Sequence, residues 1–303
     1  MNMAKSFTAP PPHPTQSADY VPARSDWLID QNWKSYTTQD HQIWAMLYQD
    51  MLQKLPGKSS KLFQAGIDRL QLDSNQIPNF KNLSERLKPF TGFEVVAVPG
   101  LIPDLVFFEH LANRRFPAGC EIRQMNGLDF QEYPDVFHDI FGHVALLAFD
   151  EIADFMEACG KAAIVAYKRG MLDYVARVYW FIVEVGLLRE DGNIVSIGAA
   201  INSSEKELKF ALHDASPNRI QFDLERVMRT DFWIYDLQSS YFILDDIKRL
   251  TNMLTNFDVL IDKVAKEPII KLGEIIESDE VISYGNGSYH AEYFESEEPS
   301  LSL

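Results

Sequence analysis

Hydrophobic residues recur at helical spacing through the N-terminal third of the chain. They predict an amphipathic helix that begins at Thr38 and ends before the Pro-Gly break at 56–57, and a second helix from Leu62 to Leu70. Residues 93–100 instead alternate weakly, are rich in β-branched side chains and close on a Pro-Gly turn, which predicts a strand followed by a loop. The same reasoning predicts a short helix, a second strand and a loop at 107–112, 120–125 and 128–134.

The rest of the chain is predicted to be mostly helical. Helical spacing continues through three successive segments, at 136–147, 150–168 and 172–188. A strand is expected after the Asp-Gly turn, at 193–201, and two further helices at 204–212 and 240–254. Long helices with few and short strands indicate a predominantly α-helical α+β fold.

One domain accounts for this pattern, because no repeat and no linker interrupts residues 38–270. We place the domain at 26–275. Residues 1–25 are rich in Pro, Ser, Thr and Gln and lack hydrophobic periodicity, so we expect a disordered N-terminal tail. The polar residues 276–303 are expected to form an acidic C-terminal tail.

Composition excludes several classes of function. The chain of 303 residues is 46% hydrophobic, which suits a globular protein with a large core. Its net charge of -16 repels phosphate backbones and anionic lipids, so neither nucleic acid nor a membrane surface is an expected partner. Two distant cysteines favour a reducing cytoplasm, and no stretch resembles a signal peptide or reaches the about 20 apolar residues that span a bilayer. Small molecules are therefore the expected partners.

Two histidines lie five residues apart in the apolar segment PDVFHDIFGHVALL. Because each helical step turns by about 100°, a regular helix would point His138 and His143 roughly 140° apart. If both rings face one point, the helix needs a local irregularity, for which Gly142 is the obvious place. The spacing alone leaves open whether these are metal ligands or buried, hydrogen-bonded core histidines.

A carboxylate stands in a helix that is apolar on every side. Glu184 belongs to VYWFIVEVGLL at 178–188. Burying its charged carboxylate costs on the order of several kcal/mol unless a positive group compensates the charge. The compensating group is either an arginine, Arg177 or Arg189, or a metal dication. Two imidazoles and one carboxylate form the facial triad of non-heme Fe(II). Two histidines and a glutamate can be picked from almost any sequence, so their spacing alone does not decide between a metal site and an arginine partner.

The ordered motifs carry a resemblance to a known family. The chain contains IPNFKNLSERLKPFTGFEVVAVPGLI, LANRRF, PDVFHDIFGHVALL, YWFIVEVGL and GAAINSSEKEL in this order. From about Trp44 to about Leu250 it resembles the catalytic domain of the pterin-dependent aromatic amino acid hydroxylases, most closely the short bacterial members that act on phenylalanine. The resemblance implies a single basket-like catalytic domain that binds Fe(II) and tetrahydrobiopterin, or a related tetrahydropterin. It also implies hydroxylation of L-phenylalanine to L-tyrosine with O2, the first step of phenylalanine catabolism.

The resemblance also assigns residues to roles. The iron ligands, which are the catalytic residues, match His138, His143 and Glu184. The positions at the pterin match Gly100, Ile102, Phe107, Asp139 and Tyr179. Those at the amino acid match Arg123, Pro134, Asp135, Trp180 and Ser203.

Within the amino acid site, the resemblance gives each residue a task. Arg123 grips the α-carboxylate with a planar fork that Lys cannot reproduce, and Asp135 orients Arg123 or the first iron ligand. Pro134, His138 and Trp180 form the walls of the ring pocket. Ser203 and Glu207 support the iron ligands.

The chain departs from its animal relatives at two places. Pro103 and Asp104 replace serines in the loop that meets the pterin, so contacts to the cofactor tail are not carried over. Gln131 replaces a threonine that touches substrate, and that role is not carried over either.

Two alternatives remain open on sequence grounds. One is the same chemistry on tryptophan or tyrosine, since all members share the triad. The other is a non-catalytic protein in which zinc ties two helices together, although a closed tetrahedral site needs a fourth protein ligand that the chain does not offer nearby. No regulatory domain precedes the catalytic segment and no heptad helix follows it, so we expect a monomer or a dimer.

Overall fold

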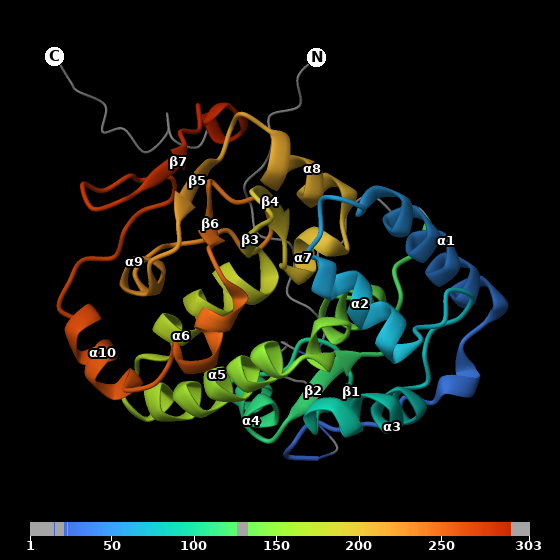
Figure 1. Cartoon of the computed structure of the whole chain (residues 1–303). Helices are drawn as coiled ribbons and strands as arrows, with labels where there is room; N and C mark the ends of the chain where they lie inside the picture. The colour runs from blue at the N-terminus through green and yellow to red at the C-terminus, as the bar shows by residue number, and fades with distance from the viewer. Residues whose placement is uncertain (1–14, 16–20, 23, 126–132, 292–303) are drawn as a thin grey trace, which may run out of the picture.

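The computed structural model describes residues 15, 21–22, 24–125 and 133–291 (Figure 1). Most of the predicted N-terminal tail, 1–25, and the last twelve residues lie outside the described part. The architecture is the predicted one, mainly helical with short strands, in one domain. Within the described residues, no helix has both the length and the apolar character needed to cross a bilayer.

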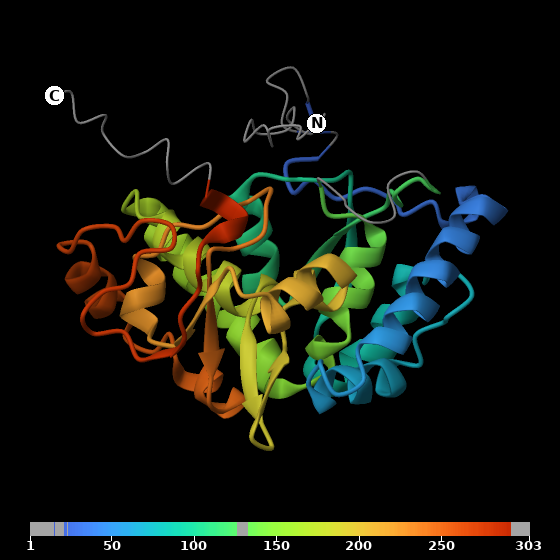
Figure 2. The ribbon, with the colours of Figure 1, turned by 90° about the horizontal axis from the view of Figure 1, so that it is seen from above.

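Three helices form one side of the molecule (Figures 1 and 2). They are α1 at Thr38–Lys54, α2 at Lys61–Leu70 and α3 at Phe80–Thr91, and the first two confirm the predicted helices. Thr37 and Asp40 form a capping box at the start of α1, and the Ser60 side chain accepts the hydrogen bond that begins α2. The buried stripes of these helices meet in the main core.

A parallel pair of strands lies beside these helices. Strand β1 at Glu94–Val98 is followed by helix α4 at Asp104–Ala112 and strand β2 at Arg115–Gly119. The strand predicted at 120–125 is wrong, because β1 pairs instead with the five residues before it. After Gly119 the backbone bonds elsewhere: the Arg123 N–H donates to the Asp135 carboxylate.

Helix α5 at Asp150–Lys168 packs against α4 and α6. It follows a π-helix, η4 at His138–Val144, and a 3-10 turn, η5 at Leu146–Ala148. Helix α6 at Leu172–Tyr179 continues into a second π-helix, η6 at Trp180–Glu184. The helix predicted at 172–188 therefore ends four residues early, because the chain turns at Gly186 to enter the sheet.

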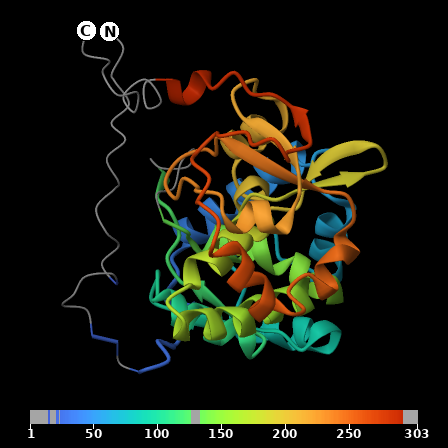
Figure 3. The same cartoon turned by 90° about the vertical axis from the view of Figure 1, so that its left-hand side faces the viewer.

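The sheet has five strands in the order β4-β3-β6-β5-β7. They span Leu187–Glu190 for β3, Asn193–Ser196 for β4, Asn218–Gln221 for β5, Ser240–Leu244 for β6 and Val281–Ser283 for β7. The β3–β4 hairpin projects from the rest of the molecule (Figures 2 and 3). The segments that connect these strands contain α7 at Ala199–Asn202, α8 at Glu205–His213, α9 at Leu224–Met228 and α10 at Phe257–Val264. Further 3-10 turns are η2 at Trp33–Ser35, η7 at Ile247–Asn252 and η8 at Ser288–His290.

Two sequence predictions in this region were wrong. The strand predicted at 193–201 ends at Ser196, and its last residues belong to α7. The helix predicted at 240–254 begins as strand β6, which pairs in parallel with both β3 and β5. A central strand of this kind is buried on both faces, so its apolar run is continuous and has no period that separates it from a buried helix.

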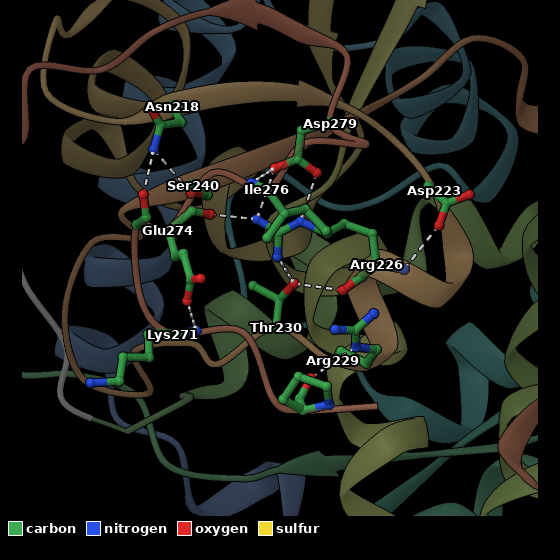
Figure 4. A network of polar contacts seen from close by, with 12 residues as sticks. Asn218, Asp223, Arg226, Arg229, Thr230, Ser240, Lys271, Glu274, Ile276 and Asp279 are labelled. Carbon is green, nitrogen blue, oxygen red and sulfur yellow. Dashed lines mark hydrogen bonds and ion pairs between the residues drawn. The ribbon is translucent and has the colours of Figure 1, made fainter. Parts of the chain in front are cut away.

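The C-terminal segment returns to the domain. The tail predicted from 276 is wrong for 276–291, because β7 pairs with β5. Asp279 forms a buried bidentate ion pair with Arg226 of α9, whose Nε donates at 2.8 Å and Nη2 at 3.2 Å (Figure 4). The same guanidinium donates to Thr230 and to the Glu274 carbonyl. Asp279 also accepts from the Ile276 N–H at 3.0 Å, so both ions have further hydrogen-bond partners within the fold.

We expect Arg226→Met to destabilise the protein by about 3–5 kcal/mol, because it leaves the Asp279 carboxylate buried without its partner. Urea unfolding followed by circular dichroism measures the change. The double variant Arg226→Met, Asp279→Leu should recover most of the loss, since it removes both charges. A single variant as stable as the parent would contradict this account.

Candidate active site

The two histidines of the PDVFHDIFGHVALL segment face each other. The segment is π-helical, and its i→i+5 hydrogen bonds make residues five apart neighbours. The Nε2 atoms of His138 and His143 lie 3.1 Å apart, and the ring centroids 4.9 Å apart. The predicted irregularity is therefore confirmed. A Cβ on Gly142 would stand 2.8 Å from the Ala199 carbonyl oxygen, so this glycine lets the π-helix approach α7.

Glu184 reaches the same point from the other π-helix. Its Oε2 lies 3.4 Å from the His138 Nε2, and its Oε1 lies 3.3 Å from the His143 Nε2. Arg177 and Arg189, the alternative partners, instead pair with Asp231 and Asp245. Among the described residues, these three side chains are the group whose ligand atoms could share one metal ion.

Ser203 fixes the tautomer of His138. The serine hydroxyl donates to the Ala199 carbonyl at 2.8 Å, so its oxygen accepts from the His138 Nδ1, 3.0 Å away. A proton on Nδ1 leaves the Nε2 lone pair of a neutral ring directed at His143 and Glu184. The Nδ1 of His143 is buried without a hydrogen-bond partner among the described residues.

This geometry fits a six-coordinate cation. Ligands that are adjacent on an octahedron with bonds near 2.1 Å stand about 3 Å apart, which matches the three separations among these atoms. Burial would raise the pKa of Glu184, but the two imidazoles beside the carboxylate outweigh burial and hold that pKa well below its usual range. An ionised carboxylate and imidazole lone pairs that converge in a buried space need a positive ion between them.

We expect Ser203→Ala to weaken iron binding by roughly 10- to 100-fold, since the His138 ring would lose the acceptor that sets its tautomer and orientation. Competition with a coloured Fe(II) chelator measures the affinity. Ser204→Ala, one residue on at the start of α8, is the matched control and should retain the parent affinity. Equal affinities for parent and Ser203→Ala would show that the hydroxyl does not support the ligand.

Asp139 lies between the metal ligands and the loop predicted to meet the pterin. Its Oδ2 accepts a hydrogen bond from the Gly119 N–H at 2.7 Å, and Gly119 is a neighbour of Gly100. Burial raises the pKa of Asp139 to about 7, although the charge of His138 and the Gly119 N–H oppose the shift. Ile102 is half-buried in the same loop, and Pro103 and Asp104 are exposed.

The predicted pterin-site aromatics meet in one cluster. The ring of Phe107, from α4, lies 5.5 Å from that of Tyr179 at the end of α6, in an edge-to-face arrangement. Phe108 contacts the same tyrosine at 5.8 Å. Phe107 remains half-buried, so part of its surface is open to a ligand. Tyr179 also immediately precedes the π-helix that carries Glu184.

Arg123 is held by Asp135, as the sequence predicted. The guanidinium Nε and Nη2 donate to the two carboxylate oxygens at 2.8 Å, and both side chains are buried. Asp135 also accepts from the backbone N–H of His138 at 2.9 Å. A single carboxylate therefore positions both the arginine and the first residue of the π-helix.

Trp180 and Pro134, two other residues predicted at the amino acid, have different surroundings. Trp180 stacks on Phe232 with centroids 4.8 Å apart, whereas Pro134 is exposed. Gln131 and most of the loop predicted at 128–134 lie outside the described residues. Sequence reasoning missed Phe232 and the Gly119 N–H, because nothing in the sequence links positions that only the fold brings together.

Glu207, predicted to support the iron ligands, bonds elsewhere. It accepts a hydrogen bond from the Tyr241 hydroxyl at 2.7 Å, and burial raises the pKa of Glu207 to about 7. A raised pKa means that the folded state binds this proton more tightly than the unfolded chain does. The resulting stabilisation is complete below about pH 4.5 and is lost as the pH rises through about 7.

We expect the change in stability caused by Glu207→Gln to be more favourable at pH 8 than at pH 4 by about 3 kcal/mol, because each tenfold change in proton affinity corresponds to about 1.4 kcal/mol. The amide oxygen can still accept from Tyr241. Thermal unfolding of parent and variant across this range measures the difference. A difference independent of pH would contradict the prediction.

Comparisons with known proteins point in one direction. The sequence pattern of the biopterin-dependent aromatic amino acid hydroxylases matches residues 32–287. The chain is similar to the phenylalanine-4-hydroxylase of Caulobacter vibrioides, with 46% identity over 88% of this chain and 91% of that protein. It is also similar to the one of Chromobacterium violaceum, with 39% identity over 94% and 97%.

Solved structures agree. The crystal structure of Chromobacterium violaceum phenylalanine hydroxylase with bound iron(III) and 7,8-dihydrobiopterin superposes with a TM-score of 0.82 at 42% identity. It covers 86% of this chain and 95% of that one. A cobalt-bound structure of the same enzyme gives a TM-score of 0.84 at 41% identity, over 87% and 96%.

Proposed function

We propose that this chain, which belongs to the biopterin-dependent aromatic amino acid hydroxylases, converts L-phenylalanine to L-tyrosine with O2 and a tetrahydropterin at a non-heme Fe(II) centre. The observation that carries the proposal is the convergence of His138, His143 and Glu184 on one point. Three protein ligands on one face leave the other positions of an iron ion for exogenous molecules. When bound, the iron and the reduced pterin together supply the electrons and the activation that O2 needs.

The residues around the triad have distinct tasks in this proposal. Arg123 binds the α-carboxylate of the amino acid, and Asp135 holds the guanidinium in place. Trp180, backed by Phe232, and Pro134 line the space for the aromatic ring. This placement turns the ring toward the ligand cluster, because Asp135 also positions His138.

The pterin side is formed by a second group. Phe107 and Tyr179 offer apolar surface to the planar ring, and the loop with Gly100 and Ile102 offers its backbone. The Asp139 Oδ2 accepts from the Gly119 N–H, which leaves Oδ1 for a hydrogen bond to another group. That oxygen is thus suited to form a hydrogen bond with a ligand beside the metal ligands.

An aerobic assay tests the proposal directly. The purified protein is incubated with Fe(II), a tetrahydropterin and, separately, L-phenylalanine, L-tryptophan and L-tyrosine, and products are identified by mass spectrometry. We expect tyrosine from phenylalanine as the main product, with oxygen uptake that requires both iron and pterin. Faster hydroxylation of tryptophan or tyrosine would show that the assigned substrate is wrong. Iron binding without oxygen uptake would refute the enzymatic role.

Two further expectations belong to the same proposal. We place the enzyme in the cytoplasm, a location supported by two cysteines that are both free thiols. We also expect a monomer or a dimer, and light scattering after gel filtration determines which.

A further inference from the structure

A small apolar cavity lies beside one metal ligand. It is lined by residues of both π-helices, including Gly142, His143, Ile182 and Val183, and by Ile152 and Met156 of α5. The remaining lining residues come from η5, α5, the β4–α7 connection and the first residue of α7. Its volume of about 20 Å³ exceeds the roughly 10–15 Å³ that is needed to hold a molecule of the size of water.

The lining is unsuited to a polar occupant. Apart from His143, its side chains are aliphatic, aromatic or thioether, and its surface is mostly apolar. A buried water needs two to four polar partners, whereas apolar cavities stay dry and accept apolar gases such as xenon. The chemistry of the lining therefore selects a small, uncharged and apolar molecule.

The cavity is separate from the places assigned to the other reactants. Among the described residues, none of those proposed for the pterin or for the amino acid lines it. Its link to the site is His143 itself, together with Val183, which immediately precedes Glu184. A molecule in the cavity thus contacts the ligand cluster without crossing the pocket of either organic substrate.

We propose that this cavity is a dioxygen site that holds the gas next to His143. The inference rests on the proposed function, which makes O2 a substrate. Dioxygen is close to water in width, has no hydrogen bonds to lose and gains dispersion contacts with the closely packed apolar lining. The cavity would raise the local supply of O2 while the amino acid and the pterin occupy the open side of the site.

Xenon locates the site without any turnover. Crystals of the iron-loaded protein are pressurised with xenon, and we expect a xenon peak between His143 and Ile152. Because xenon binding needs no substrate, it separates failure of this inference from failure of the proposed function. An empty cavity, or an ordered water bonded to the His143 Nδ1, would overturn the inference.

Cavity-filling variants test the role in the reaction. Ile152→Phe and, independently, Met156→Phe place additional atoms in the cavity from α5, away from the ligand-bearing helices. In whichever variants fold, we expect the xenon peak to disappear and the KM for O2 to rise about threefold or more. The KM values for phenylalanine and pterin, and the iron content, should stay near those of the parent.

Two controls accompany these variants. Ile152→Val preserves the open space, and Ile261→Phe adds the same ring at a buried position of α10 that does not line the cavity. Both should retain the parent KM for O2. A xenon peak in the parent combined with an unchanged KM for O2 in the filled variants would also overturn the proposal, since the cavity would then be a packing void.

Discussion

Glu184→Ala should yield a protein with little iron and no measurable tyrosine formation. The substitution removes the only charged member of the ligand set, leaving two neutral imidazoles to hold a dication. We expect iron affinity and kcat/KM each to fall by at least about 100-fold, more than is lost when an outer partner of a ligand is removed. Iron content is measured by mass spectrometry of the desalted protein, and tyrosine by chromatography.

The matched control is Glu85→Ala, which removes an exposed carboxylate from α3. It should retain iron and activity, which shows that the loss of a negative charge is not itself the cause. Full iron loading and normal turnover in Glu184→Ala would remove Glu184 from the site. The proposed function would then lose the observation on which it depends.

Arg123→Lys should raise the KM for phenylalanine by roughly 10- to 100-fold while the KM for the pterin changes by less than about threefold. An ammonium group cannot bind Asp135 and a substrate carboxylate with the two parallel bonds that a planar guanidinium forms. Because the pterin is assigned to other residues, its binding should be nearly unaffected. Steady-state kinetics with each substrate varied in turn gives both constants.

Arg249→Lys, at an exposed position, controls for the exchange of arginine for lysine as such. A far-UV spectrum and an unfolding curve show whether Arg123→Lys retains the fold, since it also alters a buried ion pair. Equal increases in both KM values would indicate general damage to the site. The carboxylate-binding role of Arg123 would then be wrong.

More of the candidate site than of the surrounding fold could be predicted from the sequence. Hydrophobic spacing predicted the first two helices, α1 and α2, whose caps and apolar stripes are local properties, whereas α3 at Phe80–Thr91 was not predicted. The five-residue spacing of His138 and His143 indicated an irregular helix, and that irregularity is a π-helix. The choice of Glu184 over other carboxylates depended on a resemblance spread over many motifs, because the spacing alone did not decide.

What could not be predicted depends on long-range pairing. Residues 240–244 form a central strand because β3 and β5 lie on either side, which no local pattern encodes. Residues 276–291 are mostly polar, yet they pack against the domain because Asp279 forms an ion pair with Arg226 and β7 pairs with β5. Polarity alone therefore misplaced the end of the domain.

The π-helix at His138–Val144 restricts which insertions and deletions this segment can accept. Each hydrogen-bonded turn encloses one residue more than an α-helical turn, so a deletion of one residue at 138–144 could restore an ordinary helix and still leave two histidines four apart. A change in length that no wide turn absorbs would rotate every later side chain by about 100° and move Leu146 and Leu147 out of the core. Insertions and deletions in this segment that the π-helical turn cannot absorb should therefore be rejected for their effect on packing, even where the ligands themselves survive.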